Sequence, residues 1–293
     1  MTTFQVGAVS VTEVVETAMP VPVPLAFRGP DGDADQVDAD QVAALRARYP
    51  AALFTAGGDP LLVFRSHVLR TPSSVIVLDT CWGNHKERLL DPYAHRLHTP
   101  YLDRLAAAGT DPAEVDYVFC THLHQDHVGW NTRLVDGTWV PTFPNAAYLF
   151  VAAEYEHFST VPAGTHGHDS FADSVLPVVT AGRHRLVEPG FAIDDTVRIE
   201  PLPGHTPGHS GLHVTSGSQE AVFTGDLFHV AHQFARPSWH IVSEHDAARA
   251  TQTRRAFLAR YADTGVRVVP AHFNLPAGGY LESRPGGYAY APA

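Results

Sequence analysis

The chain has 293 residues, of which 44% are hydrophobic and 17% charged, and its formal net charge is −11 at pH 7. This composition supplies enough apolar material for a buried core and argues against general disorder. A nucleic-acid partner is disfavoured, because phosphate recognition relies on clustered Lys and Arg side chains and the sequence has no such cluster. Small neutral molecules or cations fit the charge better.

The sequence also lacks the usual membrane and export signals. No apolar run approaches the ~18 residues that a membrane-spanning helix needs. Residues 1–12 lack the basic start and apolar stretch of a signal peptide, so we expect no membrane partner and a cytoplasmic location. Cys81 and Cys120 form no CxxC pair and are expected to be buried thiols. The 19 histidines, beside 20 Lys and Arg, raise the expectation of metal chemistry.

Short apolar runs alternate with helical patterns along the first half of the chain. Residues 4–15 alternate and are rich in Val and Thr, which predicts a first strand or hairpin. We interpret Asp31–Asp40 as a solvated loop, with Asp40 as the N-cap of a helix over 41–48. The pattern then predicts strands over 61–68, 73–80 and 115–121, and a helix over 99–108. This alternation favours a layered α/β domain.

The second half repeats the scheme. A helix is predicted over 169–178, and strands over 196–202, 210–215 and 219–224. Ser243, with Asp246 three residues later, predicts a capping box before a last helix, and the strand Val266–Val269 follows. No change of composition suggests a linker, so we expect a single domain over residues 1–293. Residues 18–60 are a candidate lid or dimer-contact insertion, with a plain surface loop as the alternative.

Four residues of metal-binding type follow one apolar strand. The run Tyr117-Val-Phe-Cys-Thr leads directly into His122, His124, Asp126 and His127. In an extended chain the two residues of an HxH pair point to the same side, and a following turn can bring the last two residues back toward them. A bare HxH is usually a surface feature of a polar loop. The added Asp and His favour two metal sites a few ångströms apart.

Three later segments supply further ligands. The glycines and prolines of Pro203–His209 build a tight loop that can fix His205 inward. We expect His209 to lie behind the ligands, because the turn cannot aim both rings at one ion. Asp226 ends a strand, where a carboxylate can bridge two cations. His272 follows the strand Val268-Val269 in the same way.

In this order, the motifs HxHxDH, PGHTPGH, TGD and PAH resemble the metallo-β-lactamase superfamily over Asp79 to His272. The resemblance implies an αββα sandwich with the site at one edge between its sheets. It implies one ion on His122, His124 and His205, a second ion on Asp126, His127 and His272, and Asp226 as the bridge. Asp79 matches an acidic position behind the ligands, with a capping or turn Asp as the alternative.

The expected cofactors are two divalent metal ions. No Cys occupies a ligand position, and imidazole and carboxylate suit zinc, with manganese, iron or cobalt as alternatives. Two close ions can hold a bridging hydroxide that attacks the substrate. Asp226 or Asp126 would then pass a proton to the departing oxygen. We therefore expect a dinuclear hydrolase.

Within the superfamily, the segment Gly225–Phe234 resembles the lactonase and methyl parathion hydrolase branch. N-acyl homoserine lactonases commonly have Tyr at the position of His229. We consider two roles for His229, a catalytic hydrogen-bond donor to the substrate oxygen and a packed or surface histidine.

Five aromatic residues lie close in sequence to a ligand or a strand end and would, as a set, wall an apolar pocket: Trp82, Trp130, Phe228, Phe234 and Phe273. Each alone is more typical of a core. The set favours a small apolar ester or lactone as substrate. An organophosphate (aryl phosphotriester) hydrolase is the first alternative. A non-catalytic ligand-binding protein of the same fold is the second, although seven intact ligand positions argue against it. A homodimer is the candidate assembly.

Overall fold

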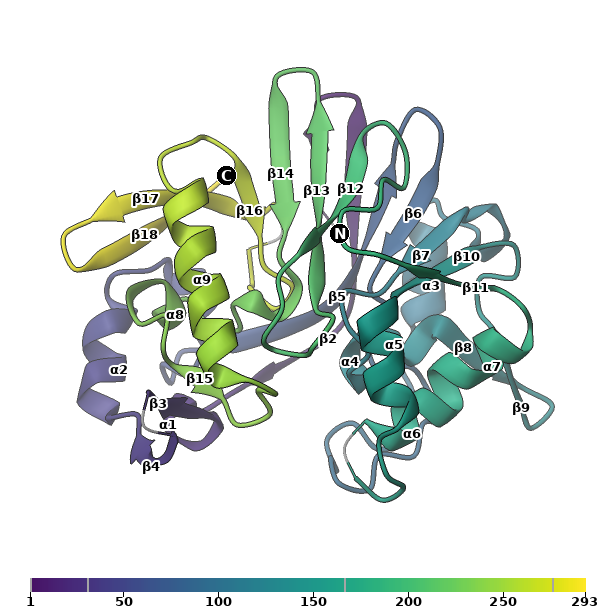
Figure 1. Cartoon of the computed structure of the whole chain (residues 1–293), viewed down its shortest axis with the longest axis horizontal. Helices are drawn as coiled ribbons and strands as arrows, with labels where there is room; N and C mark the ends of the chain where they lie inside the picture. The colour runs from purple at the N-terminus through teal and green to yellow at the C-terminus, as the bar shows by residue number, and fades with distance from the viewer. Residues whose placement is uncertain (1, 31, 166, 276) are drawn as a thin grey trace. The chain divides into compact units, whose positions relative to one another are not determined.

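The structure, a computed structural model, describes residues 2–30, 32–165, 167–275 and 277–293, without the side chains of residues 32–36. The chain forms two compact units, and Figure 1 labels helices and strands of both. The first comprises Met1–Thr17 and Phe64–Thr196, and the second comprises Ala18–Val63 and Val197–Ala293. Each unit therefore draws on two separate stretches of the chain. The expectation of a single domain is not tested by this division and stays a prediction.

The first unit is built on a seven-stranded sheet. Two of its strands, β2 and β5, lie mostly in this unit and have one end in the other. The order of the sheet is β1-β2-β5-β6-β7-β10-β11. The strands are β1 (Thr3–Val6), β2 (Val9–Pro20), β5 (Leu61–Arg70), β6 (Val75–Leu78), β7 (Tyr117–Phe119), β10 (Ala147–Val151) and β11 (His184–Val187). β1 and β2 form the predicted hairpin, with Thr3 opposite Thr12. The last four strands are parallel, and the three inner ones, β6, β7 and β10, are nearly continuous apolar runs.

Parallel pairing brings two loops to one edge of this sheet. Leu78 of β6 pairs with Phe119 of β7, and the next residue, Asp79, donates its backbone N–H to the Phe119 carbonyl at 2.9 Å. The carboxyl ends of adjacent parallel strands lie together, where α/β proteins commonly place functional groups. The segment after β7 and the carboxylate after β6 are therefore neighbours.

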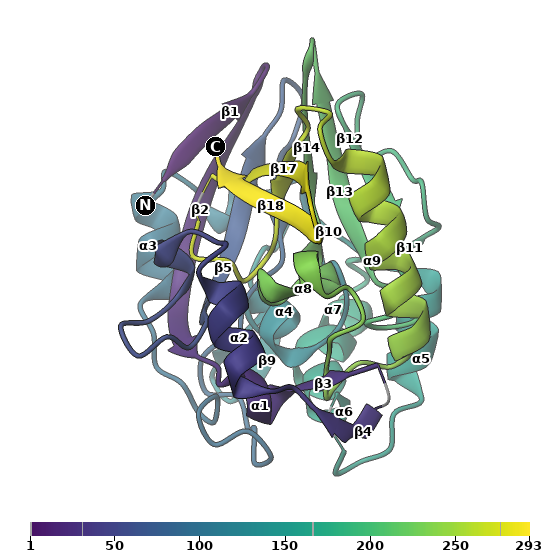
Figure 2. The same ribbon diagram turned by 90° about the vertical axis from the view of Figure 1, so that its left-hand side faces the viewer.

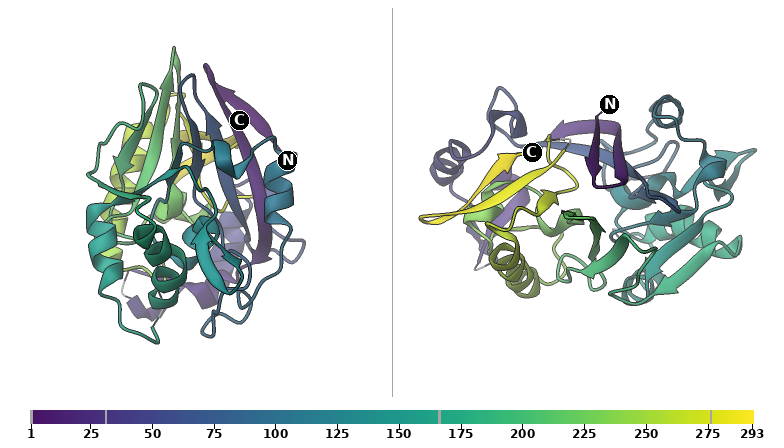
Figure 3. Two further views of the ribbon diagram at one scale, coloured as in Figure 1. Left: turned by 90° about the vertical axis from the view of Figure 1, so that its right-hand side faces the viewer. Right: turned by 90° about the horizontal axis from the view of Figure 1, so that it is seen from above.

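Helices and a hairpin complete the first unit. They are α3 (Tyr101–Ala107), η2 (Pro112–Glu114), α4 (Gln125–Val128), η3 (Gly129–Asn131), β8 (Thr132–Val135), β9 (Thr138–Pro141), α5 (Ala152–Ser159), α6 (His168–Ser170), the π-helical η4 (Phe171–Val175) and α7 (Leu176–Thr180). α5 packs against β10 and β11 and can be followed in Figure 3. Cys81 and Cys120 are free and buried, as predicted.

The second unit contains a six-stranded sheet of order β12-β13-β14-β16-β17-β18. Its strands are β12 (Val197–Pro201), β13 (Ser210–Ser216), β14 (Gln219–Phe223), β16 (Arg267–Val269), β17 (Gly279–Arg284) and β18 (Gly287–Pro292). α9 (Ala247–Tyr261) lies along this sheet in Figures 1 and 2. Its predicted apolar face is present, because Phe257, Leu258 and Tyr261 are buried. The Tyr261 hydroxyl donates to Glu200 of β12 at 2.7 Å.

The segment 18–60 belongs to the second unit. It contains α1 (Val23–Ala26), β3 (Phe27–Gly29), β4 (Gly32–Gln36), α2 (Ala39–Arg46) and η1 (Ala51–Leu53). β3 pairs with β4 and with β15 (His240–Ile241) in a small sheet, and α2 packs against α8 (His232–Ala235). A lid or dimer-contact role for this segment stays a prediction.

Two helix starts differ from the predictions. The N-cap of α2 is Asp38, not Asp40, because the Asp38 carboxylate accepts the backbone N–H groups of Asp40 and Gln41. The N-cap of α9 is Asp246, which accepts from the Arg249 N–H, so the capping box on Ser243 was wrong. In both cases several polar residues precede the helix, and the chain path selects which carboxylate reaches the open N–H groups.

One predicted loop is also wrong. Most of the stretch Asp31–Asp40 was expected to be solvated loop, but Gly32–Gln36 forms β4 and α2 already begins at Ala39, while Asp31 lies outside the described residues. β4 forms because it pairs with β3, where Gln36 lies opposite Arg28. Such pairing between segments cannot be predicted from a run of acidic residues. In the part of the chain that the structure describes, no helix has the length and apolar character needed to cross a membrane.

Candidate metal centre

The first unit gathers the four potential ligands that follow β7. β7 ends at Phe119 and α4 begins at Gln125, so His122 and His124 lie on the link and the other two on the first turn of α4. The His122 Nε2 and His124 Nδ1 atoms lie 2.9 Å apart. On its other side, His122 Nδ1 lies 3.1 Å from the Thr121 hydroxyl. Two ring nitrogens thus converge on one point, as a shared cation requires.

Asp79 fixes the orientation of His127. Its Oδ1 accepts the Thr121 backbone N–H at 2.8 Å, and its Oδ2 lies 2.9 Å from His127 Nδ1. The remaining ring nitrogen of His127, Nε2, faces Asp126 Oδ2 at 3.4 Å. This is the contact that the predicted role of Asp79 requires, since a carboxylate on the outer nitrogen of a ligating imidazole sets its tautomer.

A glycine allows α4 to approach the loop after β6. The backbone N–H of Gly129 donates to the Cys81 carbonyl at 2.7 Å. A Cβ on Gly129 would lie only 1.9 Å from the Trp82 carbonyl carbon, so no larger residue fits without moving the backbone. Gly129 therefore holds the ligand-bearing turn against the loop that carries Asp79.

In the second unit, Asp226 presents its two oxygens to different imidazoles. Its Oδ1 lies 3.0 Å from His272 Nε2, and its Oδ2 lies 3.5 Å from His205 Nε2. All three side chains are buried. Asp226 lies in η5 (Gly225–Leu227), directly after β14, and His272 follows β16, which pairs in parallel with β14. A carboxylate that faces an imidazole at each of its two oxygens has the arrangement of a bridging ligand.

The outer nitrogens of these two histidines are anchored differently. His272 Nδ1 donates to the Val63 carbonyl at 3.3 Å. His205 Nδ1 lies 3.3 Å from Glu244 Oε1. Burial opposes ionisation of Glu244, but the charge of Arg254 and the hydrogen bond from His205 outweigh it and lower the pKa of Glu244 to about 2. A buried carboxylate anion therefore stands behind His205.

His209 lies behind Asp226. Its Nε2 accepts the backbone N–H of Asp226 at 3.0 Å, and its Nδ1 lies 2.7 Å from the Leu202 carbonyl. His209 thus contacts the backbone of a candidate ligand, as its predicted role requires.

His229 is the third imidazole beside Asp226. Its Nε2 lies 3.1 Å from Asp226 Oδ2, and its backbone N–H donates to Gln233 Oε1 at 2.7 Å. Burial, partly opposed by the charge of Asp226, lowers the pKa of His229, which keeps the ring neutral. The donor atoms of His205, Asp226 and His229 all lie within 4.8 Å of one another.

The sequence pattern of the metallo-beta-lactamase superfamily matches residues 65–272. The chain belongs to the metallo-beta-lactamase superfamily. This membership confirms the predicted αββα class and the predicted family. At the level of the family it also confirms an enzyme of the metal-dependent hydrolase class.

Proteins similar to this superfamily member carry lactonase names. N-acyl homoserine lactonase AttM of Rhizobium johnstonii is 29% identical over 238 residues, which is 74% of this chain and 84% of that protein. An N-acyl homoserine lactonase of a Bacillus species is 28% identical over 131 residues, which is 44% of this chain but only 45% of that protein's length.

Solved structures of low identity share the fold. The hydrolase AbOPH of the beta-lactamase superfamily has a TM-score of 0.79 at 23% identity, covering 99% of this chain and 96% of its own. AidC, a dizinc quorum-quenching lactonase in complex with a product, has a TM-score of 0.75 at 21% identity, covering 100% of this chain and 97% of its own. At these identities the likeness establishes the fold alone.

The donor set of this superfamily member fits divalent metal ions. The donors are imidazole nitrogens and carboxylate oxygens, and each of four imidazoles has its Nδ1 against a hydroxyl, a carboxylate or a carbonyl: His122, His127, His205 and His272. Anchoring one nitrogen leaves the other for an ion, which is the usual arrangement of ligating histidines.

The predicted pocket aromatics are packed within their units. Trp130 stacks on Tyr101 with ring centroids 5.1 Å apart and donates its indole N–H to Glu16. Trp82 packs against Phe64 at 5.1 Å. The other three are buried, and Phe234 contacts both Phe228 and Phe273. These contacts are those of core residues, and a role in a substrate pocket stays a prediction.

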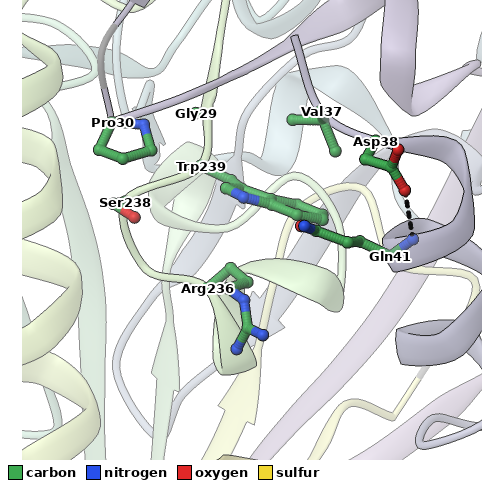
Figure 4. Close-up of a pocket in the computed structure, with 8 residues that line it drawn as sticks. All are labelled: Gly29, Pro30, Val37, Asp38, Gln41, Arg236, Ser238 and Trp239. Atoms are coloured by element: carbon green, nitrogen blue, oxygen red, sulfur yellow. Dashed lines mark hydrogen bonds between the residues drawn. The ribbon is translucent and has the colours of Figure 1, made fainter. Parts of the chain in front are cut away.

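A small pocket of the second unit is lined largely by the segment 18–60. It has a volume of about 300 Å³ and is lined by Gly29, Pro30, Val37, Asp38, Gln41, Arg236, Ser238 and Trp239 (Figure 4). Gln233 connects its wall to His229, because Gln233 Nε2 donates to the Trp239 carbonyl while Oε1 accepts from the His229 N–H. None of the predicted metal ligands lines this pocket.

Three residues near the candidate ligands were not predicted from the sequence: Glu244, Arg254 and Gln233. Glu244 precedes the N-cap of α9 and Arg254 lies in its interior, where charged residues usually face solvent. Their ten-residue separation matches neither helical spacing nor a metal motif, so the sequence offers no local signal for them. Gln233 could have been noted, because it lies four residues after His229.

Proposed function

We propose that this chain is a dinuclear metal-dependent hydrolase of lactones and apolar carboxylic esters. One ion would bind His122, His124 and His205, the second would bind Asp126, His127 and His272, and Asp226 would bridge them. The observation that carries the proposal is the orientation of Asp226, whose two oxygens face His272 and His205 separately. The superfamily membership supports the assignment of these seven residues to one dinuclear site.

Two bound divalent ions supply a water of lowered pKa and polarise the carbonyl of the substrate. Zinc is the ion we assign, because the donors are histidine and aspartate in a fold shared with a dizinc lactonase. Asp79 and His209 would hold the ligands in place through His127 and through the backbone of Asp226.

The chain's own carboxylates and His229 would manage the protons. Lactone hydrolysis adds the oxygen of water to the carbonyl carbon, breaks the ring C–O bond and gives a proton to the departing alkoxide. Asp226 or Asp126 delivers this proton. The neutral His229 donates from Nε2, the nitrogen that faces Asp226, to the substrate oxygen, where charge develops.

The substrate class rests on the relatives and on the composition of the chain. Both relatives described above are N-acyl homoserine lactonases, so we assign a small acyl lactone. The net charge of −11 agrees with a neutral substrate rather than an anionic one. The proposal that the five aromatic side chains named above wall an apolar pocket agrees with such a substrate.

The test combines metal counting with a substrate panel. We expect two zinc ions per chain by elemental analysis, and hydrolysis of γ-lactones and acyl homoserine lactones faster than of aryl esters or paraoxon-like triesters. Asp226→Ala should lose activity and at least one ion, whereas Asp103→Ala, at an exposed aspartate of α3, should change neither. Fewer than two ions at saturation, or full activity of Asp226→Ala, would refute the dinuclear mechanism. Faster hydrolysis of triesters than of lactones would change the proposed substrate class from lactones to phosphotriesters.

His229 is tested separately. His229→Phe keeps a planar ring but removes the donor, and we expect kcat for lactones to fall about 100-fold, in the range known for loss of one donor to a developing oxyanion. His229→Tyr restores a donor and should recover part of the rate. Equal lactone rates for all three proteins would remove His229 from the reaction.

A further inference from the structure

A buried ion pair stands directly behind His205. Arg254 Nη1 and Nη2 each lie 3.1 Å from Glu244 Oε2. Neither side chain has exposed surface. Removing two charges from water costs free energy, which their attraction offsets only when further hydrogen bonds hold both groups. Stability alone is therefore a weak reason for this buried pair, and we look for a role at the site.

The guanidinium is held by further bonds. Arg254 Nε donates to the Pro237 carbonyl at 2.8 Å, and Nη1 donates to the Leu227 carbonyl at 3.3 Å. Leu227 directly follows Asp226, and Pro237 follows α8, so Arg254 ties the loop of the bridging carboxylate to α9. A guanidinium restrained at three places fixes the position of the carboxylate that it binds.

The second oxygen of Glu244 faces the candidate ligand. Glu244 Oε1 lies 3.3 Å from His205 Nδ1, and His205 Nε2 faces Asp226 Oδ2 at 3.5 Å. A carboxylate oxygen attracts a proton and repels a lone pair, so the approach of Glu244 Oε1 favours the tautomer with the proton on His205 Nδ1 and the lone pair on Nε2. A ring held in this way is ready to bind an ion through Nε2.

We propose that Glu244 is a positioning residue that sets the tautomer and direction of His205, and that Arg254 holds Glu244 in place. The inference rests on the proposed function, because His205 must be a metal ligand for the tautomer to matter. The same arrangement occurs in the first unit, where Asp79 Oδ2 lies 2.9 Å from His127 Nδ1. By contrast, the anchor of His272 is a neutral carbonyl.

Glu244→Gln gives a sharp expectation. Arg254 requires an oxygen on its side, so the amide of Gln must turn its NH2 group toward His205. That donor needs an unprotonated Nδ1, which moves the ring proton to Nε2, the atom that should bind the ion. Ring ¹⁵N NMR of the metal-free protein should therefore show the His205 tautomer reversed, with the signal assigned by its absence in His205→Gln. In Glu244→Gln, one of the two zinc ions should bind about 10–100-fold more weakly than in the wild type, as measured by chelator competition.

Glu200→Gln is the matched control. Glu200 is also a buried carboxylate of the second unit, but it contacts Tyr261, Arg260 and His213, none of which is a candidate ligand. This variant should keep the zinc affinity and the His205 tautomer of the wild type. Equal weakening of zinc binding in both variants would reduce Glu244 to a structural role and overturn the proposal.

A shorter acid keeps the proposal testable if Glu244→Gln does not fold. Glu244→Asp retains the charge that Arg254 requires but draws the second oxygen away from His205, so zinc affinity should fall while the melting temperature stays closer to that of the wild type. A wild-type affinity in a folded Glu244 variant would overturn the proposal. Failure of the proposed function can be told apart from failure of this inference. In the first case the wild type would bind fewer than two ions. The tautomer of His205 is measured in the metal-free protein and does not depend on that count.

Discussion

The imidazole of His209 connects the Leu202 carbonyl to the backbone N–H of Asp226, at 2.7 Å and 3.0 Å respectively. A carbonyl can only accept, so Nδ1 carries the proton and Nε2 accepts from Asp226. Both nitrogens are thereby committed to backbone groups. His209 is suited to hold the turn that carries Asp226, and not to bind an ion itself.

Replacing His209 should therefore impair the site without removing a ligand. His209→Ala leaves a buried N–H and a buried carbonyl without their partner, which costs about 1–3 kcal/mol for each group in the free energy of unfolding. Displacement of Asp226 should lower kcat/KM for a γ-lactone about 10–100-fold. Steady-state kinetics and urea unfolding measure the two effects. Arg255→Ala, at an exposed residue of α9, should change neither quantity. Wild-type kinetics in His209→Ala would contradict the assigned role.

Removal of metal should lower thermal stability as well as activity. Ions that bind only the folded chain stabilise it by mass action, by about 2.7 kcal/mol for one site at a free ion concentration of 100 times Kd. Dialysis against a chelator should therefore lower Tm and abolish lactone hydrolysis, and added zinc should restore both. Differential scanning calorimetry measures the shift.

Asp226→Asn serves as the control for the metal effect. This change keeps the size of the side chain but removes its charge, so the zinc-dependent rise in Tm should shrink. The same Tm for wild type with and without zinc would contradict metal binding to the folded chain.

The places of the candidate ligands at strand ends could be predicted from sequence because each motif is local, while metal binding by them stays a prediction. His122 to His127 follow one strand, and Asp226 and His272 end two others, so the short apolar runs locate them. The helix caps were placed less well, because several acids compete near each helix start and only the chain path selects Asp38 or Asp246.

Contacts between distant segments could not be predicted. The anchoring of His272 by the Val63 carbonyl joins residues more than two hundred positions apart.

β17 and β18 lack a distinctive pattern, because Gly, Pro and Tyr in that region are equally typical of loops. The single domain, the homodimer and the cytoplasmic location stay predictions.

Phe234 separates the core role of the aromatic residues from the predicted pocket role. Its ring has no exposed surface and packs against Phe228, Phe273 and Tyr290. Phe234→Ala should lower the free energy of unfolding by about 3–5 kcal/mol, since it leaves a cavity in the packed unit. If the residue serves the core alone, KM for a γ-lactone should stay unchanged at temperatures where the variant is folded.

Val242→Ala is the control for Phe234, because Val242 is 56% exposed in the same unit. We expect its effect on unfolding to stay within about 0.5 kcal/mol. A large rise in KM for Phe234→Ala, with little loss of stability, would instead support the pocket role.

Lys86, the only lysine of the sequence, is fully buried in the first unit. Its ammonium donates to the Thr132 hydroxyl at 2.6 Å and lies 3.5 Å from the centroid of the Trp139 ring. Asp173 lies 3.5 Å away but is shared with Arg88, which binds it at 2.7 Å. Burial, only partly offset by Asp173, lowers the pKa of Lys86 to about 7.

This pKa predicts stability that rises with pH. The unfolded chain keeps the lysine proton up to its ordinary pKa of 10.5, whereas the folded chain loses it above about 7. Between these values the unfolded state binds more protons, so the free energy of unfolding should rise by up to about 1.4 kcal/mol per pH unit from this group. Below pH 7 both states are protonated and the cost of burying the charge is present in full.

Urea unfolding of the wild type and of Lys86→Met between pH 6 and 9 measures this contribution. The stability of the wild type relative to the variant should increase with pH, because Met has no proton to lose and other titrating groups cancel in the comparison. A lone lysine also gives one side-chain signal in a ¹⁵N-lysine NMR titration, so its pKa can be read directly. A constant difference between the two proteins, together with a lysine pKa near 10.5, would show that Lys86 stays charged in the folded chain.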